Sequence, residues 1–279
     1  MLQNLLYGLT IGGILYITSI GLSLTYGTMR IVNFAHGILY TLGAYGLVAS
    51  LARLTGNFAA GAAVGVLAVA PIAYLIDRLV IQRLRAASVD YVIIATYALI
   101  YVGVDAIKWI WGPNPIPLSD PIGKLVTLPG TTLTLPVYRL VIIGAAILTY
   151  LGLRQFFKRT LIGKIVVAGL EDPDGVKALG IDVDRCFSLV FLLGSCLAAL
   201  GGVLYAPITT VQPYMGMTIL RLGFAVVLVG GLGNLNGTFW SALGLGLLMS
   251  VTSMFWGAAA EASVFVVMAI ALILKPEVT

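Results

Sequence analysis

The residues of this chain that are best suited to contact a solute form one short cluster. Asn33-Phe-Ala-His36-Gly37 contains the chain's only histidine and lies between two apolar segments. Asn and His offer neutral donors and acceptors, which can touch a polar solute without holding it tightly. Backbone that breaks helical form at membrane depth has to be buried in protein or line a cavity. We therefore expect Asn33, His36 and Gly37, together with Tyr40, to line a route for a small solute. In the alternative, the cluster is a short loop in which His36 only caps a helix.

A second cluster, Gly230-Gly-Leu-Gly-Asn-Leu-Asn-Gly237, has four glycines in eight residues. That is too many for a stable helix, so we expect a loop or hinge at membrane depth. Gly231, Gly233 and Asn234 should face the first cluster across the route. Each cluster opens an apolar segment that contains Leu-Gly, at 42–43 and at 243–244. This echo favours a parallel internal repeat, and Gly-interrupted segments in two halves point to a transport pathway.

Motifs for catalysis are missing from the sequence. Gly123-Lys124 and Gly163-Lys164 lack the upstream glycine and the following Ser or Thr of a phosphate-binding loop, and no dinucleotide fingerprint occurs. A single histidine cannot form a metal cluster, and Cys186 and Cys196 are not spaced for zinc. The sequence therefore predicts no catalytic residue, no metal and no cofactor. We expect a protein that is not an enzyme and that takes any energy for work from another subunit.

The elements that must position these clusters follow from composition. Of 279 residues, 60% are apolar and 10% are charged, and the mean hydropathy is +1.05. A soluble domain carries about 25% charged residues, so a typical soluble enzyme and a nucleic-acid-binding basic domain are both excluded. The sequence predicts an all-α polytopic transmembrane bundle of about eight to nine spans, formed by a single domain over residues 1–279. The expected spans are 5–28, 33–51, 58–80, 90–111, 136–157, 186–207, 217–232, 237–256 and 260–274. The seventh is short and Gly-rich, which favours a broken or re-entrant helix.

Basic residues indicate the orientation in the membrane. Alternating spans put eleven Lys and Arg residues on one side and five on the other, and cytoplasmic loops carry the excess. This places the N-terminus outside and the C-terminus in the cytoplasm. Asp105 and Lys108 are expected to pair near the outer end of the fourth span, and Glu261 and Arg221 to lie at headgroup depth. The outer loop at 112–135 is rich in Pro and Gly, which is typical of an ordered cap.

The one long polar segment on the inner side covers residues 158–185. Its pattern is helix, turn and helix, with Asp172 as an N-cap, Pro173 in the first turn and Gly180 as the stop. A short helix along the inner membrane face is the simplest structure that fits this pattern. Such a segment suits docking to a soluble partner.

Several stretches together match a known family. They are Gly21-Leu-Ser-Leu-Thr-Tyr-Gly27, Asn33-Phe-Ala-His-Gly37 with Leu42-Gly-Ala-Tyr45, the loop from Gly163 to Arg185, Leu193-Gly to Leu204, and the second cluster. In these stretches the chain resembles the inner-membrane permeases of branched-chain amino acid ABC importers, a group that also includes urea and amide permeases. The resemblance implies a bacterial inner-membrane permease that pairs with a second homologous permease. Two cytoplasmic ATPases and a soluble substrate-binding protein would complete the importer.

The same resemblance implies that the segment 158–185 is a coupling segment that docks on an ATPase. The residues expected to take part are Lys164, Glu171, Asp172, Asp174, Lys177, Gly180 and Asp184. Two positions depart from the family pattern. Many relatives carry an acidic residue where this chain has Ile38, which bears on the substrate and pore chemistry. Many carry an arginine where it has Val167, which bears on the ATPase contact.

The predicted function is therefore the permease subunit of an ATP-driven importer for branched-chain or other small neutral amino acids. Urea or short-chain amides are the alternative substrates. A stand-alone channel would need a selectivity filter or charge rings, and a secondary transporter an ionisable relay. An intramembrane enzyme would need a nucleophile with its base, or a metal cluster. None of these features stands out in the sequence, and a route without unpaired charge suits neutral or zwitterionic solutes.

Overall fold

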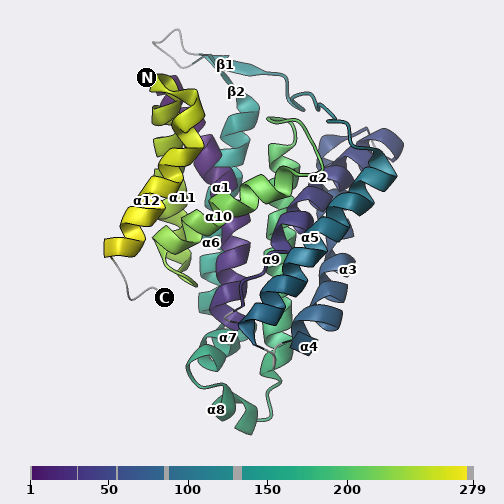
Figure 1. Cartoon of the computed structure of the whole chain (residues 1–279), viewed down its shortest axis with the longest axis vertical. Coiled ribbons are helices and arrows are strands. Elements are labelled where there is room, and N and C mark those ends of the chain that lie inside the picture. Colours follow the sequence, from purple (N-terminus) through teal and green to yellow (C-terminus); the bar gives the residue numbers. More distant parts are fainter. Residues whose placement is uncertain (1, 30, 55, 85–87, 128–133, 275–279) are drawn as a thin grey trace.

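The computed structural model describes residues 2–29, 31–54, 56–84, 88–127 and 134–274 and shows a helical bundle with a small hairpin at one end (Figure 1). The α-helices are α1 (Leu2–Met29), α2 (His36–Arg53), α3 (Phe58–Ile76), α4 (Gln82–Leu84), α5 (Val89–Trp111), α6 (Val137–Arg159), α7 (Leu161–Glu171), α8 (Pro173–Ala178), α9 (Val183–Tyr205), α10 (Met215–Gly230), α11 (Leu235–Phe255) and α12 (Ala260–Leu274). A π-helical turn, η1 (Asp77–Ile81), joins α3 to α4, and a 3₁₀ turn, η2 (Gly257–Ala259), precedes α12. The strands β1 (Leu125–Thr127) and β2 (Thr134–Pro136) pair antiparallel.

Within the described ranges, seven helical stretches are long and apolar enough to cross a membrane, and α10 is a shorter apolar helix. This confirms the predicted all-α polytopic bundle. The seventh expected span, predicted to be short, is α10 with 16 residues. The second expected span, 33–51, is wrong at its start, because residues 31–35 are not helical and α2 begins at His36. The third continues past residue 80, because η1 carries the helix on into α4.

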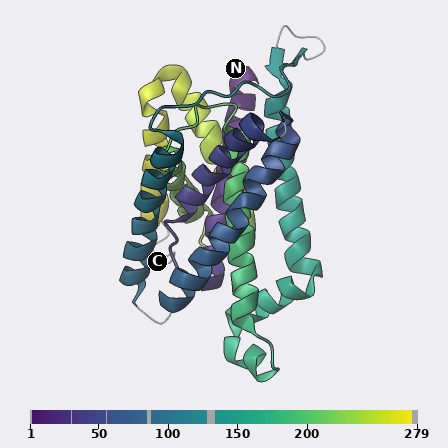
Figure 2. The ribbon, with the colours of Figure 1, turned by 90° about the vertical axis from the view of Figure 1, so that its right-hand side faces the viewer.

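Helices α1 and α9 form the centre of the bundle (Figures 1 and 2). The buried share of the most apolar stretch is 72% in α1 and 56% in α9. It is 17% in α6 and 6% in the stretch formed by η2 and α12. Small residues permit this packing. A Cβ atom added to Gly12 of α1 would lie 2.9 Å from the Leu243 Cα of α11, and one on Gly194 of α9 would lie 2.9 Å from the Gly21 carbonyl oxygen. Such close approach drives helix association where lipid is as apolar as the side chains.

The two ends of the bundle differ in structure. The start of α1 and the β1–β2 hairpin lie at one end, whereas α7 and α8 project from the other in both views (Figures 1 and 2). The loop after α5 is tied to the segment after α9 by an antiparallel bridge between Ile116 and Val211. The bridge holds this part of the loop against that segment. The prediction that the loop at 112–135 forms an outer cap stays a prediction. Residues 128–133 of that loop lie outside the described part of the chain.

The ion pair expected near the outer end of α5 is present. The Lys108 Nζ atom lies 3.0 Å from the Asp105 Oδ1 atom, and it also donates to the Tyr214 hydroxyl at 2.6 Å. Lys108 therefore joins α5 to the segment that leads into α10. This contact is a structural link between two helices that flank the site described below.

Candidate functional site

Helix α2 begins half-way along α1. The His36 Nε2 atom lies 2.8 Å from the carbonyl oxygen of Thr18, which precedes the last residue of α1, Met29, by about 16 Å of helical rise. After the end of α1 the chain therefore turns back alongside this helix, and α2 starts beside Thr18. The helix break expected around Asn33 to Gly37 is present, and it is enclosed by protein.

The side chains of the break are buried. His36 and Asn33 are each 1% exposed, and His36 bonds to Thr18 through one ring nitrogen only. Its Nδ1 atom and both amide atoms of Asn33 have no hydrogen-bond partner among the described residues. Asn33 does not cap α2, because the N-cap position is taken by Ala35 without a side-chain bond. These polar atoms are buried inside the bundle without the hydrogen-bond partners that buried groups normally have.

Gly37 marks the point where α2 crosses α10. A Cβ atom on Gly37 would lie 2.8 Å from the carbonyl oxygen of Gly216, and one on Gly216 would overlap the carbonyl oxygen of Gly37. Both helices therefore start at one backbone contact. Glycine is required at both positions because any side chain would separate the helices.

The second cluster lies elsewhere on α1. Gly231 and Gly233 have positive φ angles of 91° and 78°, and Asn234 caps α11 by accepting a bond of 3.0 Å from the Gly237 N–H. A Cβ atom on Gly233 would lie 3.0 Å from the Cα atom of Gly27, near the end of α1. The loop expected here is thus present. It contacts α1 about 9 Å further along the helix than Gly21, whose surroundings include His36.

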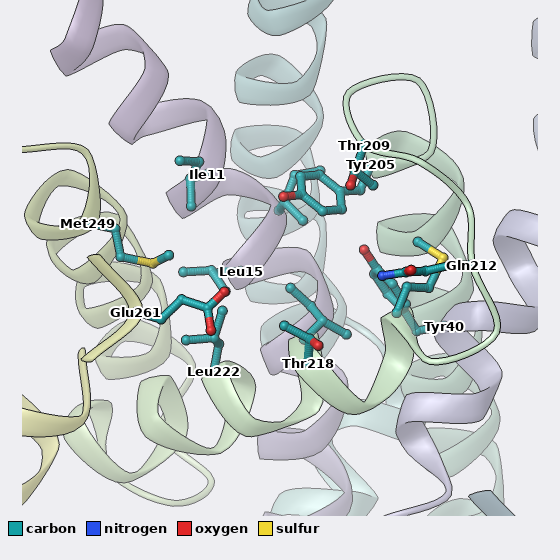
Figure 3. A pocket seen from close by; sticks show the side chains of 13 residues that line it. Ile11, Leu15, Tyr40, Tyr205, Thr209, Gln212, Thr218, Leu222, Met249 and Glu261 are labelled. Atoms are coloured by element: carbon teal, nitrogen blue, oxygen red, sulfur yellow. The ribbon is translucent and has the colours of Figure 1, made fainter. Parts of the chain in front are cut away.

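A cavity of 220 Å³ opens between α1, α2, α10 and α12 (Figure 3). Of the seven predicted route residues, Tyr40 lines it, while the other six are absent from its lining. The apolar part of the wall includes Ile11, Leu15 and Leu222. Further polar atoms come from residues that were not predicted from the sequence to line the route. That set is Tyr205, Thr209, Gln212, Thr218 and Glu261.

Tyr40 and Glu261 face each other across this cavity (Figure 3). Tyr40 is 0% exposed, and its hydroxyl has no hydrogen-bond partner among the described residues. Glu261, which is expected at headgroup depth, is exposed at the start of α12, and its side chain lines the same cavity as Leu15 of α1. Its depth in the membrane stays a prediction. The sequence shows Glu261 only as an acidic residue at the start of an apolar segment, and it does not show which helix this side chain faces.

The seven residues expected to contact an ATPase gather at the other end of the molecule. Lys164, Glu171, Asp172, Asp174, Lys177, Gly180 and Asp184 are all exposed on α7, α8 and the start of α9. Asp172 caps α8 by accepting a bond of 2.9 Å from the Gly175 N–H, with Pro173 at the first helical position. Gly180 has a φ angle of 77° and directly follows Leu179, the C-cap residue of α8. The helix–turn–helix pattern and its cap are confirmed.

Comparison with known proteins decides the family. A family profile described as "Branched-chain amino acid transport system / permease component" matches residues 4–274. The chain belongs to this family. The permease is 25% identical over 269 residues to the high-affinity branched-chain amino acid transport system permease protein LivH of Escherichia coli (strain K12), a match that covers 91% of the permease and 86% of LivH.

Other relatives have similar coverage. The permease is 26% identical over 267 residues to the permease protein BraD of Pseudomonas aeruginosa, covering 88% of the permease and 84% of BraD. It is 28% identical over 263 residues to the probable branched-chain amino acid transport permease protein LivH of Methanocaldococcus jannaschii, covering 88% and 79%. A solved structure entitled "PsaBC from Streptococcus pneumoniae in complex with Fab" aligns with 98% of the permease and 89% of that chain, at 15% identity and a TM-score of 0.49.

Ile38 packs against a glycine of another helix. The permease has Gly103 on α5 directly opposite, and a Cβ atom there would overlap the Ile38 side chain. Ile38 is 3% exposed and fills this notch. An apolar residue at position 38 and a glycine at position 103 therefore form a matched pair. Among the described residues of the permease, no group of three or more His, Cys, Asp or Glu side chains could hold a metal ion.

Proposed function

We propose that the permease is the transmembrane subunit of an ATP-driven importer for branched-chain or other small neutral amino acids. The observation that carries this proposal is the family match over residues 4–274, together with relatives named as branched-chain amino acid permeases. ATP hydrolysis belongs to two cytoplasmic ATPase subunits. A second permease of the same family and a soluble substrate-binding protein complete the complex in the bacterial inner membrane, with the N-terminus outside and the C-terminus in the cytoplasm.

Helices α7 and α8 supply the contact with the ATPases. They project beyond the rest of the bundle (Figure 1) and combine exposed charges with exposed apolar side chains, of which Leu179 is 77% and Leu161 is 73% exposed. Gly163 packs on the backbone of Phe156 and Phe157 at the end of α6, so movement of α7 is passed to a membrane helix. A rigid-body shift of this unit is one known way to move the rest of a transporter.

The substrate route enters at the Tyr40 cavity and passes the helix break towards Gly231, Gly233 and Asn234. The contact between Gly27 and Gly233 lies at the end of this route that is farther from the Tyr40 cavity. A buried polar group without a partner costs about 1–3 kcal/mol, which applies to Asn33 and His36 here. A conformation in which the route opens and these groups meet substrate or water would recover that cost. We therefore place Asn33, His36 and Gly37 on the inner part of the route.

A urea or amide permease is the second candidate within the family, and a stand-alone channel or secondary transporter is the candidate from another class. Proteoliposomes that contain the permease, its partner permease, the ATPases and the binding protein separate them. The proposal predicts that the ATPases co-purify with the permease and that ATP drives the uptake of L-leucine. Uptake of urea or acetamide without leucine supports the second candidate, and leucine movement through the permease alone refutes the ATP-driven assignment.

A further inference from the structure

Two cavities meet at one tyrosine. The 220 Å³ cavity that contains Tyr40 and Glu261 shares Ile11, Ile14 and Tyr205 with a neighbouring cavity of 230 Å³. Figure 3 shows the Tyr205 side chain on the wall of the first. A cavity of about 150 Å³ holds benzene, so each of these spaces is of the right size for an amino acid of the size of leucine.

The two cavities carry opposite charges. Glu261 lines the first, and Arg139, near the start of α6, lines the second. Tyr205 lines both cavities, so one side chain borders the space beside each charge. The Arg139 guanidinium stacks on the Tyr7 ring at 4.0 Å from its centroid, which fixes its position. No ion pair joins either charge to another side chain in the part of the chain that the structure describes.

Neutral hydrogen-bonding groups and apolar side chains complete the arrangement. The Tyr40 hydroxyl is buried without a hydrogen-bond partner among the described residues, and Tyr40 lines the same cavity as Tyr205. On the facing side, Ile11, Ile14 and Leu15 of α1 present a branched apolar surface. An acid, a base, two hydroxyls and an aliphatic wall correspond to the parts of an aliphatic amino acid zwitterion.

We propose that the Glu261 carboxylate binds the α-ammonium group of the transported amino acid and that the Arg139 guanidinium binds its α-carboxylate, where the two cavities adjoin beside Tyr205. The substrate's aliphatic side chain packs on Ile11, Ile14 and Leu15. This assignment rests on the proposed function, because it takes the substrate to be an amino acid. A charged donor and a charged acceptor give stronger hydrogen bonds than neutral ones, so the pair discriminates zwitterions from urea and amides.

Direct binding tests this assignment. The full transporter complex without its binding protein is placed in nanodiscs, and [³H]L-leucine binding is measured by scintillation proximity. Glu261→Gln and Arg139→Gln should each raise the Kd for leucine at least tenfold, and Glu261→Asp should restore part of the affinity. The matched controls Asp90→Asn and Arg83→Gln remove exposed charges that line neither cavity, and they should leave Kd unchanged.

A second arm identifies which group each charge binds. 4-Methylpentanoate lacks the ammonium group of leucine, so its inhibition constant against labelled leucine should be the same in Glu261→Gln as in wild type. 3-Methylbutylamine lacks the carboxylate, so its inhibition constant should be the same in Arg139→Gln as in wild type. An unchanged leucine Kd in Glu261→Gln or Arg139→Gln overturns the site, as does the absence of leucine binding to a wild-type complex that imports leucine. If the wild-type complex with its binding protein imports no amino acid, the proposed function fails and the site fails with it.

Discussion

The contact between Gly37 and Gly216 gives the sharpest prediction about the fold. Gly37→Ala would place a Cβ atom 2.8 Å from the Gly216 carbonyl oxygen, whereas ordinary contacts begin at 3.4 Å. The starts of α2 and α10 must therefore separate by about 0.6 Å, a shift set by that shortfall. Met215, beside Gly216, and Tyr40, one turn beyond Gly37, both line the cavity, so this separation also displaces its walls.

The size of the effect follows from two opposing terms. Overpacking in a close-packed interior costs about 1–3 kcal/mol, and replacing glycine by alanine in a helix gains up to about 1 kcal/mol. Gly144→Ala in α6 is the matched control, because its new Cβ atom would have no heavy atom within 4 Å. Relative to this control, Gly37→Ala should be destabilised by about 1–3 kcal/mol, since the helix-propensity gain is common to both.

Thermal unfolding of the two purified variants measures this difference. At about 2–4 °C per kcal/mol, the apparent Tm of Gly37→Ala should be roughly 2–12 °C below that of Gly144→Ala at the same scan rate. Leucine uptake should fall in Gly37→Ala and stay normal in Gly144→Ala. An apparent Tm of Gly37→Ala equal to or above that of the control would show that α2 and α10 do not cross at this contact.

Three further predictions concern the route and its coupling. Gly180→Leu forces a leucine into a φ angle of 77°, which costs about 1–2 kcal/mol. Substrate-stimulated ATPase activity should therefore fall, while the complex should still assemble, as measured by co-purification. Unchanged stimulation would refute coupling through this segment. His36→Ala and Asn33→Leu should each lower leucine uptake at least severalfold in the assembled complex with basal ATPase activity as control, and normal import by both would remove the break from the route. The permease purified without ATPase subunits should hydrolyse no ATP above a protein-free blank, and nucleotide-dependent activity of that sample would contradict its assigned role.

The bundle was predictable because its signals are local. A mean hydropathy of +1.05 and the lengths of the apolar segments indicate membrane helices directly. The start and end of α8 follow from residue type, because the effects of Asp172, Pro173 and Gly180 extend only a few residues along the chain. The π-helical form of η1 was not predictable in this way, because its residues, Asp77–Ile81, include no Gly or Pro that marks a change of helix type.

The candidate site was only partly predictable because its residues meet through tertiary packing. Asn33 and His36 mark the break correctly, but their burial depends on how α2 returns beside Thr18 of α1. Glu261 and Arg139 are separated by more than a hundred residues, and each shares a cavity with Tyr205 only in the folded bundle. Single charges next to apolar segments are common at membrane interfaces, so sequence position alone could not select these two.

The central claim is that amino acids cross the permease through the Tyr40 cavity. Thr218 lines this cavity, so a Thr218→Cys variant in a background without Cys186 and Cys196 can report on it. Proteoliposomes carrying the complete transporter are treated from the outside with a charged, membrane-impermeant thiol reagent. Lys124→Cys, on the exposed loop between α5 and α6 that is expected to lie on the same side, is the control. The account predicts that modification at position 218 abolishes ATP-driven leucine uptake, that leucine slows this modification, and that modification at position 124 has no effect on uptake. Full modification at position 218 with normal leucine uptake would contradict it.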